Sequence, residues 1–247
     1  MNPEEYSNLA NVEREHWYYR GKREIVRHWL MASSRFRPEQ VLLDCGAGTG
    51  LFAEEMATHC RVMVVDDHEE SLRMLRARFR SEQVVQLDDR RVPLADASVD
   101  YVTALDVLEH VPDDAAVVRD FYRMLRAGGL AAITVPASMA LWSDWDVGLH
   151  HFRRYSRRQI KALFPEGQWE LIHVNYTNVA VYPIVWAVRK WRKWFPKRDG
   201  QMRSEDRLPG PWTNAVLRWV FVRTALWRPP LPFGVSLILI ARKRINR

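Results

Sequence analysis

The chain has little cysteine and no long apolar run. Two of its 247 residues are cysteines, too few for a disulfide framework. No segment approaches the ~20 uninterrupted apolar residues of a membrane-spanning helix, and the acidic N-terminal segment lacks the apolar core of a signal peptide. These absences argue against a disulfide-stapled secreted protein and against an integral membrane protein. With 47% hydrophobic residues the chain can bury one sizeable core, so we expect one main domain in the reducing cytoplasm.

A glycine-rich turn lies between an expected strand, Val41–Leu43, and an expected helix, Thr49–His59. Glycine permits positive φ and close approach of the backbone, so such a turn can present main-chain N–H groups to a ligand. A dinucleotide fingerprint would need a third glycine where Leu51 stands, and a phosphate-binding P-loop would need a lysine after the turn, where none follows. Both interpretations are therefore disfavoured. The glycines of the turn are Gly46, Gly48 and Gly50.

Acidic residues end two consecutive strands. Asp44 precedes the glycine turn, and the next apolar run, RVMVVDD, ends in Asp66 and Asp67. Asp66 lies 22 positions after Asp44, close to the spacing of roughly 20 at which a strand-end carboxylate meets ribose hydroxyls in βαβ nucleotide sites. Two such carboxylates suit a ribose combined with a positively charged ligand.

The order of motifs between Val41 and Ala137 resembles that of the class I, Rossmann-like S-adenosylmethionine-dependent methyltransferases. The matching stretches are LLDCGAGTG, VVDDHEESL, VVQLDDRRVPLADASVDYVTALDVLEHVPDD and MLRAGGLAAITVPA. Several motifs in order are far more specific than the glycine turn alone. The resemblance implies S-adenosyl-L-methionine as cofactor and methyl transfer as activity.

Expected strands alternate with expected helices, which predicts an α/β protein with a doubly wound, mostly parallel sheet. The resemblance makes the last strand antiparallel, with a helical insertion before it. Gly128 and Gly129 are expected to end the helix before the fifth strand, and Ser156 with Gln159 predicts a capping box. Expected strands are Val41–Leu43, Arg61–Asp66, Val84–Gln86, Val99–Leu105, Leu130–Val135, Trp169–Thr177 and Gly234–Arg242; expected helices include Glu13–Ala32, Glu69–Phe79, Asp113–Arg126 and Ser156–Phe164.

Four regions follow from this order. We expect an N-terminal helical cap over residues 1–39 and the cofactor-binding methyltransferase core over 40–177. A basic, Trp-rich helical insertion would span 178–232, and residues 233–247 would supply the final strand and a basic tail.

The resemblance assigns roles at the carboxyl ends of the strands, where open α/β sheets bind ligands. The three glycines would lie against the methionine and ribose portions, Asp66 would accept from the ribose hydroxyls, and Asp88 would receive the adenine amine. Asp67 and Asp89 can equally be solvated neighbours, and the aromatic cluster Trp17–Tyr19 can be a helix packed on the sheet rather than a lid. The predicted cofactor-binding residues are Tyr19, Arg20, Asp44, Gly46, Gly48, Gly50, Asp66, Asp67, Leu87, Asp88, Leu105 and Asp106.

The acceptor is expected at the segment Val135–Ser156, which is rich in polar and aromatic residues. A hydroxyl acceptor must lose its proton during attack, and histidine is the usual base near neutral pH. His151 is the first candidate, as base or acceptor-orienting group, His110 the second, and Tyr155 is added because a similar His-x-Arg-Arg-Tyr run occurs in one branch of the family.

This segment has two other interpretations. Arg153 and Arg154 can pair with Asp144 or Asp146 and merely brace the loop. A metal site built from Asp144, Asp146, His150 and His151 matches no ligand spacing, so no metal is predicted.

The C-terminal part carries the positive charge. From Trp186 onward there are 15 Lys and Arg against 3 Asp and Glu, and about half of the 11 tryptophans. Apolar residues recur at helical spacing among the basic ones, which is typical of helices that lie on anionic membranes, although the same stripes can wall an acceptor pocket. The residues are Ile184, Val188, Trp191 and Phe195 in one segment, and Trp212, Val216 and Trp219 in another.

The sequence therefore predicts a methyltransferase acting on oxygen or nitrogen of a small or lipid-linked acceptor, cytoplasmic and peripheral on the inner face of the membrane. A methyltransferase for soluble natural products or metabolites, and a non-catalytic cofactor-binding protein that docks a partner through its basic tail, are the alternatives. Nucleic acid is not an expected partner, because neither an Asn/Asp-Pro-Pro-aromatic motif nor a Pro-Cys nucleophile occurs.

Overall fold

The computed structural model describes residues 10–87, 91–194 and 208–245. The strands are β1 (Val41–Cys45), β2 (Arg61–Val65), β3 (Val84–Val85), β4 (Val99–Leu105), β5 (Leu125–Pro136), β6 (Trp169–Thr177) and β7 (Ser236–Lys243). The helices are α2 (Trp17–Ser33), α3 (Leu51–Met56), α4 (Glu69–Arg78), α5 (Asp114–Met124), α6 (Asp144–Gly148), α7 (Arg157–Ala162), α8 (Tyr182–Trp194) and α9 (Pro211–Ala225), with 3-10 turns η1 (Ser81–Gln83), η2 (Leu108–His110) and η3 (Met139–Leu141).

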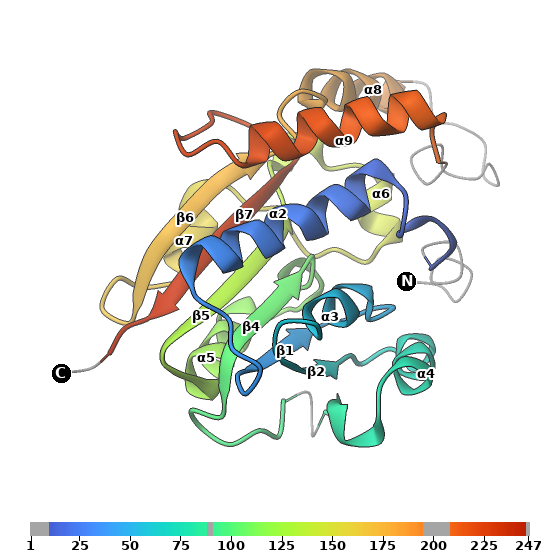
Figure 1. Ribbon diagram of the computed structural model, residues 1–247. Helices are drawn as coiled ribbons and strands as arrows, with labels where there is room; N and C mark the ends of the chain where they lie inside the picture. The colour runs from blue at the N-terminus through green and yellow to red at the C-terminus, as the bar shows by residue number, and fades with distance from the viewer. Residues whose placement is uncertain (1–9, 88–90, 195–207, 246–247) are drawn as a thin grey trace.

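The strands form one sheet in the order β3-β2-β1-β4-β5-β7-β6 (Figure 1). Neighbours from β3 to β5 pair in parallel, and β7 is antiparallel to both β5 and β6. The predicted fold class is confirmed: a doubly wound, mostly parallel sheet with an antiparallel last strand, and with α8 and α9 inserted before it. The reversal of strand order at β1 and β4 places a ligand site at their carboxyl ends.

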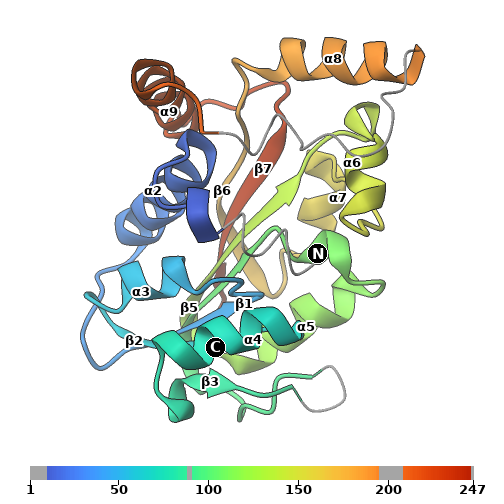
Figure 2. The same cartoon turned by 90° about the vertical axis from the view of Figure 1, so that its right-hand side faces the viewer.

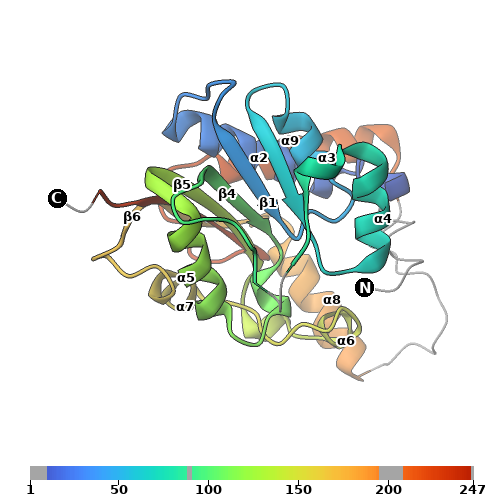
Figure 3. The ribbon, with the colours of Figure 1, turned by 90° about the horizontal axis from the view of Figure 1, so that it is seen from below.

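Helices cover both faces of the sheet (Figures 2 and 3). One face packs the buried side chains of α2, α3 and α9, with Leu75 of α4 beside them. The other packs Val118, Phe121 and Met124 of α5 and Ile160 of α7. Strands buried on both faces read as nearly continuous apolar runs, which explains why the segment Leu237–Ala241 has no polar residue.

The expected glycine stop before β5 was wrong. Helix α5 already ends at Met124, and β5 begins at Leu125, so Gly128 and Gly129 lie inside the strand. Leu125 is fully buried and pairs with Val99 of β4, and the ammonium of Lys243 donates to its carbonyl oxygen at 2.7 Å. These contacts between distant segments outweigh the local preference for a longer helix.

Helix α9 is held on α2. The Trp17 amide donates to Oδ1 of Asn214 at 2.7 Å, and the Asn214 amide donates back to the Glu15 carbonyl at 2.8 Å. Phe221 stacks on Tyr18, with ring centroids 5.7 Å apart, and fills the space beside Gly21, where a Cβ would lie 2.7 Å from its ring. The insertion is thus anchored to the N-terminal helix as well as to the sheet.

Helices α8 and α9 lie at the same end of the molecule in Figures 1 and 2. Within the described parts of the chain, no helix combines the length and the apolar character needed to cross a bilayer.

Candidate functional site

The glycine turn after β1 has the backbone that glycine allows. Gly46, Gly48 and Gly50 all have positive φ, at 65°, 57° and 79°. A Cβ at Gly46 would lie 2.5 Å from Val107, and one at Gly50 would lie 2.5 Å from Phe79, so these two positions exclude larger residues. At Gly48 a Cβ would meet no described atom within 4 Å. This part of the turn therefore leaves room for a ligand.

Asp66 holds the turn in place from the end of β2. Its carboxylate accepts from the backbone N–H of Gly48 at 2.9 Å and of His68 at 3.0 Å, and the Ser71 hydroxyl donates to the Gly48 carbonyl at 2.6 Å. Burial raises the pKa of Asp66. The neighbouring Asp67 is exposed, which agrees with the alternative that it is a solvated residue. Asp66 thus shapes the turn, a role that its predicted contact with ribose did not include.

Asp44 is buried at the end of β1. Its carboxyl accepts from the Thr103 hydroxyl at 2.5 Å. Burial, with a smaller contribution from the charge of Asp66, raises the pKa of Asp44 to about 7. A positive charge bound nearby would compensate for the buried carboxylate.

Asp106 follows β4 with a left-handed backbone, at φ 57°. The Lys22 ammonium donates to its Oδ2 at 2.7 Å and the Thr134 hydroxyl to its Oδ1 at 2.9 Å. Burial opposes both charges, but the attraction between them lowers the pKa of Asp106 and raises that of Lys22. Lys22 was not predicted, although it lies in the same N-terminal stretch as Tyr19 and Arg20. A lysine on the inward side of an amphipathic helix was the sequence signal that could have identified it.

The other predicted cofactor residues lie as follows. Tyr19 is half-buried, 5.7 Å from its ring centre to the Lys22 ammonium, whereas Arg20 is exposed and pairs with Glu24 at 3.4 Å. Leu105 and Leu87 are half-buried at the ends of β4 and β3. Asp88 and Asp89 lie outside the described residues.

Asp146 is the centre of the segment after β5. Fully buried, it accepts from the guanidinium groups of Arg154 at 2.7 Å and Arg189 of α8 at 3.2 Å, and its Oδ1 lies 3.0 Å from Nδ1 of His151. Burial opposes its ionisation, but the hydrogen bond from His151 and the charge of Arg154 lower the pKa of Asp146 to about 2. The ionised carboxylate accepts, so Nδ1 of His151 donates; in the neutral tautomer with this hydrogen bond the lone pair is on Nε2.

Arg154 thus makes the expected pair with Asp146, whereas Arg153 pairs with Asp114 at 2.8 Å instead. The Tyr155 hydroxyl donates to the same Asp114 at 2.7 Å, and the ring is buried. Burial and this hydrogen bond raise the pKa of Tyr155. The structure therefore gives Tyr155 a bracing contact rather than a free hydroxyl.

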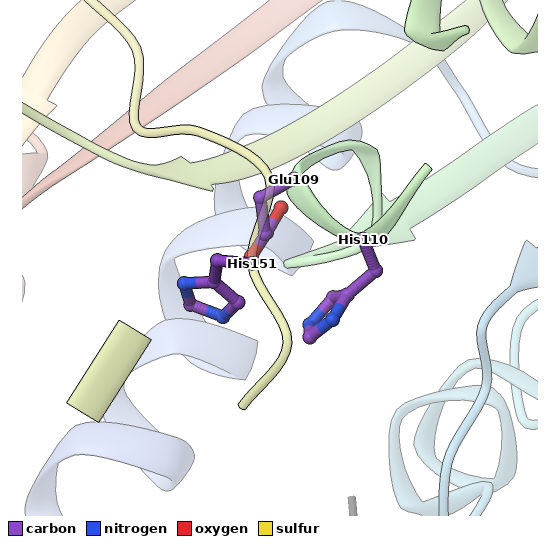
Figure 4. A group of neighbouring side chains, drawn as sticks. All are labelled: Glu109, His110 and His151. Atoms are coloured by element: carbon purple, nitrogen blue, oxygen red, sulfur yellow. The ribbon is translucent and has the colours of Figure 1, made fainter. Parts of the chain in front are cut away.

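His151 lies against His110, with ring centroids 4.6 Å apart. Figure 4 shows the Glu109 side chain beside the two rings. Burial, with the charge of His151, lowers the pKa of His110 to about 4, and burial, with the charge of Asp106, raises that of Glu109 well above its usual range. The two predicted histidines are brought together, and Glu109, which was not predicted, joins them.

Comparison with known proteins matches residues 43–133 to a methyltransferase domain family. A Mycobacterium tuberculosis protein named "Probable S-adenosylmethionine-dependent methyltransferase" is 28% identical over 176 residues, 70% of this chain and 60% of that protein. A ubiquinone biosynthesis O-methyltransferase of Acinetobacter baylyi is 32% identical over 95 residues, 36% of this chain and 40% of that enzyme. The matched part of the chain thus spans less than two thirds of the length of these relatives.

A solved structure of an S-adenosylmethionine-dependent methyltransferase from Archaeoglobus fulgidus has the same fold. The TM-score is 0.58 at 16% identity, covering 90% of this chain and 92% of that one.

The buried carboxyl of Asp44 predicts a pH effect on stability. Its pKa is 3.8 ordinarily and about 7 when folded, so the folded protein keeps a proton that the unfolded chain has lost. The resulting stabilisation is complete below about pH 4 and is lost as pH rises through about 7. Asp44→Asn removes this titration but keeps an acceptor for Thr103.

The melting temperature of the ligand-free wild type, measured by circular dichroism, should therefore fall relative to that of Asp44→Asn as pH rises from about 4.5 to about 8. Other titrating groups are common to both proteins and cancel in the difference. A difference that is the same at both pH values would contradict the raised pKa.

Proposed function

We propose that this chain, which belongs to the class I S-adenosylmethionine-dependent methyltransferase family, transfers the methyl group of S-adenosyl-L-methionine to a hydroxyl oxygen of a small or lipid-linked acceptor. The observation that carries the proposal is the junction between the glycine turn with its strand-end carboxylates and the cluster of Glu109, His110 and His151. The two halves adjoin, because Val107, which packs against the Gly46 position of the glycine turn, directly precedes η2 with Glu109 and His110.

The cofactor fits the first half of this site. S-adenosylmethionine supplies an electrophilic methyl group on a positively charged sulfur, and its amino group is a second cation. Asp44, Asp66 and Asp106 place three carboxyl groups at one edge of the sheet, and the open backbone of Gly48 allows close approach. A bound cation would favour the ionised form of the two carboxyls whose pKa is raised.

The histidine cluster suits an oxygen acceptor. Displacement at a methyl group depends mainly on holding the nucleophile at about 3 to 3.5 Å in a dehydrated site. A hydroxyl must also lose its proton, and the lone pair on Nε2 of His151 can orient or receive it. The side chain of His151 is 7% exposed and fixed by Asp146, so its direction is set before an acceptor binds. The similarity to ubiquinone biosynthesis O-methyltransferases supports oxygen over nitrogen.

The surface of α8 and α9 supports an acceptor drawn from a membrane. Trp212, Val216 and Trp219 recur at intervals of four and three on α9 and are 87%, 57% and 62% exposed. Ile184, Val188 and Trp191 repeat this spacing on α8, and all three are exposed. Phe195, the fourth residue of the predicted stripe, lies outside the described residues. In the described part of the chain these apolar side chains are exposed to solvent, which favours a docking surface over the wall of a pocket.

Positive charge lies beside this apolar surface. Lys190 of α8 and Arg223 of α9 are exposed, as is Arg228 after α9. Exposed apolar patches bordered by basic residues are suited to an anionic lipid surface. We propose that these six apolar residues, the α8–α9 patch, dock the protein on such a surface.

Replacing Asp66 tests the cofactor site. A hydrogen bond to a charged acceptor contributes about 1.5 to 3 kcal/mol, so Asp66→Ala should weaken binding of S-adenosylhomocysteine by about 10- to 100-fold in calorimetric titration. Glu82→Ala, which removes an exposed carboxylate in η1 outside the predicted site, is the control and should bind like the wild type.

Because Asp66 also holds the glycine turn, Ser71→Ala separates the two roles. That variant loosens the turn at Gly48 without removing a carboxylate, and we expect a smaller loss of affinity. Equal losses in Asp66→Ala and Ser71→Ala would show that Asp66 acts on the turn alone.

Replacing His151 tests the acceptor site. His151→Ala should lower turnover by about 10²- to 10⁴-fold while affinity for S-adenosylhomocysteine stays near that of the wild type. Transfer of labelled methyl groups to lipid and metabolite extracts supplies the assay. His150→Asn, in which an exposed neighbour is replaced by a residue that tolerates its positive φ, should retain activity. Wild-type turnover in His151→Ala would remove His151 from the reaction, and a wild type that binds the cofactor but methylates nothing would favour a binding protein.

Vesicle flotation tests the α8–α9 patch. The wild type should bind anionic vesicles better than neutral ones and lose part of this binding in high salt, since each basic residue near the surface contributes about 1 kcal/mol that salt screens. Trp212→Ala combined with Trp219→Ala should lose more than Ile245→Ala, which replaces an exposed apolar residue just beyond the end of β7. No association with anionic vesicles in low salt would instead indicate a soluble acceptor.

A further inference from the structure

Glu109 is an unusual residue for a protein core. It lies in η2 and is fully buried, and neither of its carboxylate oxygens has a hydrogen-bond partner among the described residues. A buried carboxylate without a partner costs several kcal/mol. Buried acidic groups of this kind are found paired with cations or coordinated to metals.

Two histidines present nitrogen atoms to the same space. One ligand atom each from Glu109, His110 and His151 can be chosen so that all lie within 4.8 Å of one another (Figure 4). Metal–ligand distances of about 2.0 to 2.2 Å place tetrahedral donors about 3.4 Å apart, so inward shifts of roughly 1 Å would bring the three into coordination. A backbone hydrogen bond also joins the two segments, since the Phe152 amide donates to the Glu109 carbonyl at 2.7 Å.

The surroundings of His151 match those of a metal-binding histidine. Its Nδ1 donates to Asp146, which leaves Nε2 as the ligand atom. A carboxylate that receives the second ring N–H is the usual outer partner of a metal-bound histidine, because it fixes the tautomer and the ring direction. Arg154 and Arg189 already neutralise Asp146, so this carboxylate is not itself free to take the ion.

We propose that Glu109, His110 and His151 bind one divalent transition-metal ion, with zinc as the fitting example, and that this ion holds the acceptor oxygen of the function proposed above, on which this second part rests. Two imidazoles and one carboxylate with an open position form a recognised catalytic zinc set. The site differs from the rejected combination of Asp144, Asp146, His150 and His151, sharing only His151.

The ion would account for loss of the acceptor proton. A cation lowers the pKa of a bound hydroxyl, as it does for bound water. The acceptor O–H bond breaks and its proton leaves to solvent; the oxygen then forms its bond to the methyl carbon while the carbon–sulfur bond breaks, giving S-adenosylhomocysteine. His151 acts here as a ligand, and its substitution removes the ion rather than a free base.

Cobalt absorption tests the site without any need for an acceptor. The full-length protein, treated with a chelator and titrated with Co²⁺ alone, should show visible d–d bands that saturate at one equivalent, and Zn²⁺ should displace them. Loss of an outer-shell partner costs about 10- to 100-fold in affinity, so loss of a ligand in Glu109→Gln or His110→Ala should cost at least about 100-fold. His150→Asn should bind like the wild type.

Thermal denaturation shows whether the variants are folded. Glu109→Gln keeps the size and shape of the buried carboxyl group and should melt no lower than the metal-free wild type, yet Zn²⁺ should raise the melting temperature of the wild type and His150→Asn only. Absence of d–d bands in the wild type would overturn the metal site. So would an affinity for Co²⁺ in Glu109→Gln and His110→Ala that equals that of the wild type.

Activity separates the two proposals. Methyl transfer in the extract assay should be lost on chelation and restored by Zn²⁺ or Co²⁺. Full activity in the metal-free protein would overturn the role of the ion and leave the proposed methyl transfer intact. A protein that binds metal and S-adenosylhomocysteine but methylates nothing would overturn the proposed function and, with it, the acceptor role of the ion, while leaving the metal site.

Discussion

The buried carboxylate of Asp146 connects the parts of the acceptor side. It is fully enclosed and satisfied by Arg154 from its own segment, Arg189 from α8, and His151. Arg154 also donates to the carbonyls of Ala137 and Val235, at the ends of β5 and β7. One charge therefore fixes the loop after β5 to the sheet, to the insertion and to the histidine that faces Glu109. Removing one partner from such a network leaves a buried charge uncompensated, which is strongly destabilising.

The cofactor side uses carboxylates whose environments differ. Asp106 is neutralised by Lys22 and stays ionised, whereas Asp44 and Asp66 are buried without a cationic partner at hydrogen-bond distance in the described structure. The ligand-free protein therefore carries two carboxyls that a bound cation would favour in the ionised form. Affinity for a cationic ligand and the stability of the ligand-free fold are linked at this edge of the sheet, because the same burial that destabilises the carboxylates strengthens their attraction for a positive charge.

Much of this could be predicted from local sequence. Strand periods and the capping box at Ser156 identified β6 and α7, and the glycines identified the turn with its left-handed backbone. Contacts between distant segments could not be read in this way. Lys22 and Asp106 are 84 positions apart. Glu109 could be recognised as a site residue only from the structure, where the loop that carries His151 lies against η2. The helix expected to reach Arg126 failed for the same reason, since pairing with β4 takes Leu125 into the sheet.

Helix α8 shows how the same network affects the surface. An amphipathic helix usually turns apolar residues inward, but α8 buries Arg189 against Asp146 and exposes Ile184 and Trp191. The buried ion pair fixes which side of the helix faces the core, and the apolar side chains are left outside as a consequence. A surface bound to these side chains would hold the helix that supplies Arg189. Arg189 and His151 both contact Asp146, so the helix and the histidine are linked through one carboxylate. Docking at the α8–α9 patch and the orientation of the histidine cluster would then be thermodynamically coupled, and by reciprocity an acceptor that orders His151 would also favour docking.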